Sequence, residues 1–105
     1  MARVLALVDD LMLASRVQAG LEAAGHEVRV AGSLPEPVTA DVIVCDLDVV
    51  DVAAVASAGP PTVGFYSHVE VETRRSAEQA GIDLVVPRSR MARELPALVV
   101  RLLEG

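Results

Sequence analysis

The feature that most constrains the fold is an apolar run between acidic residues at positions 41–48, DVIVCDLD. Four consecutive apolar residues bounded by acids are typical of a short strand buried on both faces in the middle of a parallel sheet. Asp46 follows at the carboxyl end of this predicted strand. In open α/β sheets, ligands bind beyond that end of the strands. Asp46 is therefore the first candidate for a functional residue.

The remaining apolar pattern predicts strands that alternate with helices. Strands are predicted over residues 4–8, 27–31, 41–46, 62–66 and 83–87, and helices over 11–24, 50–58, 69–80 and 91–104. Such alternation indicates β-α-β units, a parallel sheet and right-handed crossovers that place helices on both faces. We therefore predict an α/β three-layer sandwich, flavodoxin-like, with a five-stranded sheet of order 2-1-3-4-5.

Three segments are less regular. Residues 32–40 contain two prolines and no helical apolar pattern, so we expect a loop and a second helix that is reduced or absent. Pro96 lies inside the last helical pattern, and proline is best tolerated in a first turn, so we expect that helix to begin near Glu94. Ser67 or His68 is the expected cap of the helix 69–80.

The length, charge and composition of the chain exclude several classes of protein function. The 105 residues predict one domain, 1–105, and the net charge of −6 argues against a nucleic-acid partner. All basic residues are Arg, so mechanisms that require a lysine, including a P-loop, are excluded. The single Cys45 is expected to be a small buried hydrophobe. No apolar run reaches membrane-spanning length and no signal-peptide layout is present, so we expect no membrane partner and a cytoplasmic location.

Several candidate residues converge on one edge of the predicted sheet. The strand 4–8 ends at Asp9-Asp10 and is the neighbour of strand 41–46, so Asp9 or Asp10 should meet Asp46, with Ser67 and Arg88 flanking them. Clustered carboxylates favour a cation such as Mg²⁺, and a carboxylate beside it can attack phosphorus. A nearby hydroxyl and a cationic side chain would hold the phosphoryl oxygens.

With these features, the chain resembles a response-regulator receiver domain over essentially its whole length. The matching positions are Asp9-Asp10, Asp46, Ser67 and the run 81–83, each at the end of the expected strand or before the next one. The resemblance implies that Asp46 is the phosphoacceptor and Ser67 the switch hydroxyl. It also implies a weak Mg²⁺ site made by Asp9, Asp10 and Asp46 and by the backbone carbonyl of Asp48.

The chain departs from the receiver pattern at several positions. Arg88 takes the place of the essential lysine, and Ser89 that of the proline that follows it. Val85 replaces the aromatic switch residue, and residues 47–51 lack the usual Met-Pro and Gly. The distance from Asp10 to the glycine after the first helix is one residue short, which leaves open whether Asp9 or Asp10 faces the pocket. The resemblance is thus to an atypical, shortened receiver.

Two functions follow as expectations. The first is a stand-alone signalling domain, not an enzyme beyond self-phosphorylation, that accepts phosphate on Asp46 in a two-component phosphorelay. The alternative is a pseudo-receiver that acts without phosphorylation as a protein–protein interaction or dimerisation module. The expected partners are a sensor kinase or a downstream protein. The surface formed by the helix 69–80, the strand 83–87 and the helix 91–104 is expected to carry either a partner protein or a homodimer.

Overall fold

The five predicted strands form one parallel sheet in the computed structural model, which describes residues 2–67 and 71–105. They are β1 (Arg3–Leu7), β2 (Glu27–Ala31), β3 (Val42–Asp46), β4 (Thr62–Tyr66) and β5 (Leu84–Pro87). Their order is β2-β1-β3-β4-β5, which confirms the predicted flavodoxin-like topology. Every residue of β3 and β4 is buried, because these central strands are covered on both faces.

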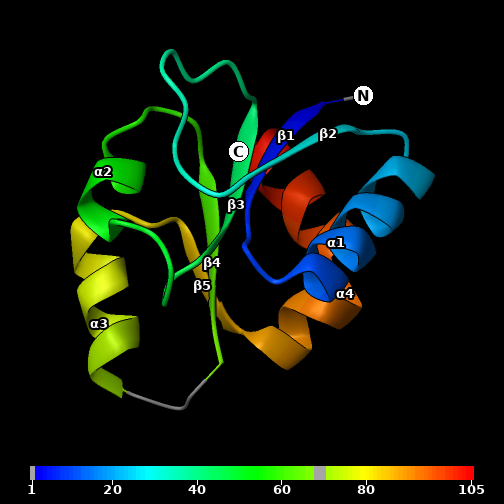
Figure 1. The fold of residues 1–105 in the computed structure, drawn as a ribbon. Coiled ribbons are helices and arrows are strands. Elements are labelled where there is room, and N and C mark those ends of the chain that lie inside the picture. The colour runs from blue at the N-terminus through cyan, green and yellow to red at the C-terminus, as the bar shows by residue number, and fades with distance from the viewer. Residues whose placement is uncertain (1, 68–70) are drawn as a thin grey trace.

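The helices lie in two layers, one on each face of the sheet (Figure 1). The helices α1 (Leu11–Ala23) and α4 (Arg88–Glu104) cover one face, and α2 (Val52–Ala56) and α3 (Val71–Ala80) cover the other. Side chains alternate along a strand, so β1 contributes to both cores. Val4 and Ala6 pack in the cluster of α1 and α4, whereas Leu5 and Leu7 pack in the cluster on the opposite face.

The crossover from β2 to β3 contains no helix, as predicted. Residues 32–41 form bends and irregular backbone, and their apolar side chains Leu34, Val38 and Ala40 pack on the core beside β1. This loop leaves one face of β2 exposed at the edge of the sheet, where Glu27 and Arg29 face solvent. The missing helix therefore uncovers one face of β2 rather than opening the core.

The last helix corrects the sequence-based boundary. The expected start near Glu94 is wrong, since α4 begins at Arg88 and contains Pro96 in its interior. An interior proline costs about 3 kcal/mol. The buried stripe of α4 outweighs this cost, because each fully buried side chain of this size contributes roughly 1.5–3 kcal/mol. The buried residues of this stripe are Met91, Leu95, Leu98 and Val99.

The ends of the other helices follow from local chemistry. The helix α2 is shorter than the predicted 50–58, because the Asp51 side chain accepts from the backbone N–H of Ala54 at 3.2 Å and caps it. Gly25 follows the C-cap of α1 with φ of 92°, the left-handed conformation expected of it. The expected start of the helix 69–80 and its His68 cap lie outside the described residues. Within the described residues, no helix is both long and apolar enough to cross a membrane.

Candidate functional site

Asp46 is a buried carboxylate at the carboxyl end of the central strand β3. Its residue is only 7% exposed, and its Oδ1 accepts a hydrogen bond from the backbone N–H of Asp48 at 3.0 Å. Burial is the main cause that raises the pKa of Asp46, and the negative charges of Asp48 and Asp9 raise it further. The hydrogen bond from Asp48 and the charge of Arg88 partly offset this rise in pKa. The charges of Asp9, Asp48 and Arg88 thus all act on the Asp46 carboxylate.

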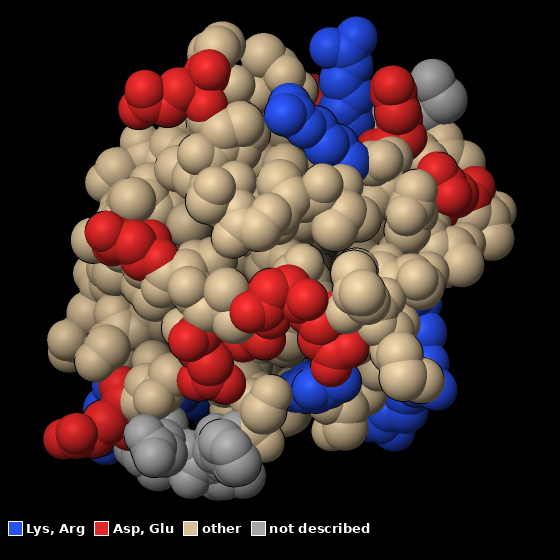
Figure 2. Space-filling view, in the orientation of Figure 1, with Lys and Arg blue, Asp and Glu red and all other residues tan. Residues whose placement is uncertain are grey.

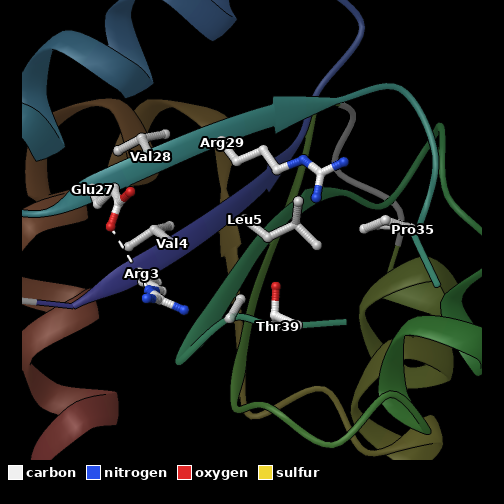
Figure 3. A pocket seen from close by; sticks show the side chains of 9 residues that line it. Arg3, Val4, Leu5, Glu27, Val28, Arg29, Pro35 and Thr39 are labelled. Atoms are coloured by element: carbon white, nitrogen blue, oxygen red, sulfur yellow. Dashed lines mark ion pairs between the residues drawn. The ribbon is translucent and has the colours of Figure 1, made fainter. Parts of the chain in front are cut away.

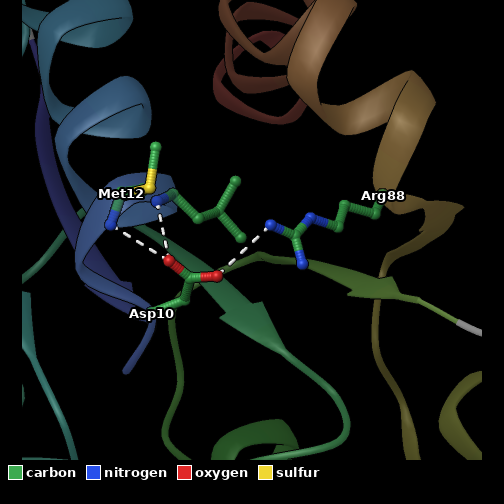
Figure 4. Close-up of polar contacts among 4 residues, drawn as sticks. Asp10, Met12 and Arg88 are labelled. Carbon is green, nitrogen blue, oxygen red and sulfur yellow. Dashed lines mark hydrogen bonds and ion pairs between the residues drawn. The ribbon is translucent and has the colours of Figure 1, made fainter.

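Asp10 is engaged with the start of α1. Its Oδ1 accepts from the backbone N–H groups of Met12 and Leu13 at 3.0 and 3.2 Å, so Asp10 is the N-cap of the helix (Figure 4). The bond from Leu13 is the largest cause that lowers the pKa of the Asp10 carboxyl. Of the two neighbouring acids, Asp9 is the one whose charge raises the pKa of Asp46. This arrangement favours Asp9 as the acid that faces Asp46.

Arg88 reaches back across the carboxyl edge of the sheet. It is the first residue of α4, directly after β5, and its Nη2 donates to Oδ2 of Asp10 at 3.4 Å (Figure 4). The two side chains are 43% and 44% exposed, so water competes with the pairing. The Arg88 guanidinium is therefore beside the acidic site, but its partner in this structure is Asp10.

Ser67 and Asp48 contact each other at the same edge. The backbone N–H of Ser67, directly after β4, donates to Oδ2 of Asp48 at 3.4 Å. A shallow hollow beside them is lined by Tyr66, Ser67 and Arg88 together with the start of α4. Sequence reasoning missed Tyr66, although its place directly before Ser67 at the end of a predicted strand was a usable signal.

The carboxyl edge of the sheet offers several oxygen atoms that could bind a cation. Figure 2 shows acidic side chains gathered beside an arginine where the strands of Figure 1 end. The carboxylates of Asp9 and Asp46 and the backbone carbonyl of Asp48 are oxygen donors of the kind that Mg²⁺ prefers. Asp10 fits less well, because it already caps α1 and pairs with Arg88. Across residues 2–67 and 71–105, no three acidic, His or Cys side chains are grouped so that they could hold a metal ion by themselves, so waters would complete the coordination of a cation at this edge.

Cys45 is a structural residue, as the sequence indicated. It is a free cysteine in the buried strand β3, and burial raises the pKa of its thiol to about 12. The reactive thiolate is therefore scarce at neutral pH.

Comparison with known proteins places this geometry among receiver domains. No protein-family profile and no curated protein sequence matches the chain. The receiver domain of the Francisella response regulator 1452 superposes with a TM-score of 0.84 at 19% identity, over 99% of this chain and 98% of that one. The chain has the fold of a response-regulator receiver domain.

Two further solved structures have the same fold. The CheY-like receiver domain protein of Methanospirillum hungatei gives a TM-score of 0.85 at 18% identity, over 99% of this chain and 94% of that one. A response regulator of Chloroflexus aurantiacus, described as putative, gives a TM-score of 0.85 at 21% identity, over 99% of this chain and 98% of that one. The receiver fold is thus preserved at a level of identity where the chemistry of the site must be argued residue by residue.

Proposed function

We propose that this receiver fold serves as a signalling domain that accepts a phosphoryl group on Asp46. The observation that carries the proposal is the place of Asp46, a buried carboxylate at the end of β3 on which the charges of Asp9, Asp48 and Arg88 act. A buried carboxylate with a raised pKa and specific charged neighbours is a functional candidate on physical grounds.

The transfer is a single displacement at phosphorus. A carboxylate oxygen of Asp46 attacks, a new P–O bond forms, and the bond from phosphorus to the donor atom breaks, with the electron pair leaving on that atom. Mg²⁺, when bound by Asp9, Asp46 and the Asp48 carbonyl, supplies positive charge that keeps Asp46 ionised. Arg88 leaves Asp10 and pairs with a phosphoryl oxygen, and the Ser67 hydroxyl donates to another.

The pseudo-receiver is the second candidate, and the polar contacts of the site favour it. Arg88 pairs with Asp10, and the Ser67 N–H donates to Asp48, so Arg88 and the Ser67 N–H have partners without a phosphoryl group. Val85 offers no aromatic ring to carry a change from the site to the surface. In this alternative the domain signals only through its contacts with another protein.

Partner binding is part of both candidates, with a sensor kinase or a downstream protein in the cytoplasm. For a homodimer, we propose the surface of α3, β5 and α4, where Val100 and Leu103 are each 43% exposed. Sedimentation velocity at high concentration tests this: Val100→Asp should abolish the dimer, because it places a charge in an apolar contact. The control is Val49→Asp, which alters another exposed valine. A wild-type monomer at all concentrations contradicts the dimer.

Incubation with acetyl phosphate and Mg²⁺, followed by intact-mass measurement, tests the phosphoacceptor. We expect one phosphate per chain in the wild type and in Asp51→Asn, which alters an exposed acid that caps α2. We expect none in Asp46→Asn. No adduct on folded wild-type protein would reject phosphorylation and leave the pseudo-receiver.

A further inference from the structure

A second hollow lies on the sheet far from the acidic site. Its volume is about 200 Å³, and it lies above β1 and β2, beside the loop that replaces the second helix (Figure 3). The residues that carry the argument are Arg3, Leu5, Glu27, Arg29, Pro35 and Thr39. Arg3 and Glu27 are the first residues of their strands, whereas Asp46 is the last residue of β3. The hollow is therefore separate from the proposed phosphoryl site.

The register of the sheet gives the hollow an apolar floor and a charged rim. Leu5 of β1 lies opposite Arg29 of β2, and Leu5 is only 3% exposed. Side chains at paired positions of parallel strands project from the same face of the sheet. In Figure 3 the Arg29 side chain extends over Leu5 toward Pro35, and Thr39 of the loop lies on the other side of Leu5.

The two arginines at the rim of the hollow differ in whether a carboxylate lies beside them. Arg3 Nε lies 3.8 Å from Glu27 Oε2, so this guanidinium has a carboxylate beside it. Arg29 forms no ion pair with any carboxylate within residues 2–67 and 71–105. An unpaired guanidinium beside an apolar floor and a hydroxyl suits a ligand with an anionic head and an apolar body.

We propose that this hollow binds a small organic anion, with a carboxylate against the Arg29 guanidinium and a short apolar or aromatic body over Leu5. The size supports a small ligand, because about 200 Å³ is below the roughly 300–1,000 Å³ typical of sites for drug-sized molecules. The site goes beyond the proposed phosphoryl transfer and depends on none of its residues. A receiver with such a site would respond to a metabolite as well as to a partner protein.

Two-dimensional ¹H–¹⁵N NMR of the full chain, titrated with sodium benzoate, tests the site. We expect saturable shifts of the amide signals of Leu5, Arg29 and Ala40, with those of the Asp46 edge unchanged. Arg29→Gln should weaken binding at least about tenfold, since a bond to a charged group is lost. Glu27→Gln should strengthen it, because a negative charge leaves the rim. Arg75→Gln, on the exposed side of α3, is the matched control and should bind like wild type.

Other results would overturn the proposal. Shifts that do not saturate, that persist equally in Arg29→Gln, or that centre on Arg88 would show that no anion site exists here. Equal shifts with benzyl alcohol, which has no charge, would show that Arg29 does not recognise the anionic head. In each of these cases Arg29 and Glu27 would only protect the exposed edge strand from pairing with other chains.

Discussion

Arg88 Nη2 lies 3.4 Å from Oδ2 of Asp10, so the first residue of the last helix pairs with the residue that caps the first helix. The pair lies at the carboxyl edge of the sheet, and the charge of Arg88 partly offsets the rise that burial causes in the pKa of Asp46. A phosphoryl group on Asp46 would therefore compete with Asp10 for the same guanidinium. This competition is a physical reason to expect slow phosphorylation.

Replacing Arg88 with the lysine that receiver domains use should speed phosphorylation. A lysine ammonium is a compact charge, whereas the arginine fork is planar and is held here by Asp10. Transition-state charge left without a partner costs about a hundredfold or more in rate. We expect Arg88→Lys to raise the rate of labelling by acetyl phosphate at least about tenfold. Arg101→Lys, in the last turn of α4, is the control, and equal rates in all three proteins would refute the role of Arg88.

Substitution by alanine at two glycines in different surroundings should change the free energy of unfolding in opposite directions. A Cβ at Gly64 of β4 would lie 2.6 Å from Leu47 Cδ2, too close for an ordinary contact. We expect Gly64→Ala to lower the free energy of unfolding by about 1–3 kcal/mol. Gly20 lies inside α1 with nothing within 4 Å of its added Cβ, so Gly20→Ala should raise it by roughly 0.5–1 kcal/mol. Urea unfolding measures both, and a stable Gly64→Ala would contradict the close packing of Leu47.

Strand order and strand boundaries were predictable from the sequence because short apolar runs between acids, glycines and prolines carry a strong signal. The two prolines in the loop between β2 and β3 also predicted that the helix there would be reduced or absent. The start of α4 was not predictable from the sequence. Proline is tolerated best in the first turn of a helix, but the burial of Met91 and Leu95 against the sheet outweighs this preference and extends the helix before Pro96. Tertiary burial of this kind does not show in a window of neighbouring residues.

The candidate site was predictable in outline but not in its pairings. The strand ends placed Asp9, Asp10, Asp46, Ser67 and Arg88 at one edge, yet which carboxylates face one another depends on side-chain contacts. Asp10 is the N-cap of α1 and the partner of Arg88 at once, a choice that the sequence left open. The exposed hollow above Leu5 and Arg29 likewise follows from the register of β1 and β2, which no sequence motif records.

The buried carboxylate of Asp46 should make the stability of the domain depend on pH. Its pKa is raised in the folded state, mainly by burial, so its contribution is favourable at low pH and is lost as pH rises through that pKa. We expect Asp46→Asn to be more stable than wild type at pH 7, and the difference to narrow as the pH falls. Urea unfolding over a pH series measures it, with Asp51→Asn as an exposed control. A constant difference at all pH values would contradict the raised pKa.

The neighbouring acids Asp9 and Asp10 should differ in their response to magnesium. A cation that binds only the folded state raises the free energy of unfolding by about 1.4 kcal/mol at ten times its dissociation constant. For a domain of this size that corresponds to a rise in Tm of several degrees. Asp9→Asn and Asp46→Asn should lose this rise, because both carboxylates are proposed ligands. Asp10→Asn should keep it, because asparagine still caps α1 and Asp10 is already engaged by Arg88.

Thermal melting with and without roughly 10 mM Mg²⁺, compared with the same ionic strength of NaCl, makes this measurement. The NaCl series controls for screening of the acidic cluster, which raises stability without a specific site. A rise that survives in Asp9→Asn and disappears in Asp10→Asn would reverse the assignment of the two acids. A wild-type chain with no rise beyond that in NaCl would remove the magnesium site and favour the pseudo-receiver, in which Arg88 remains on Asp10.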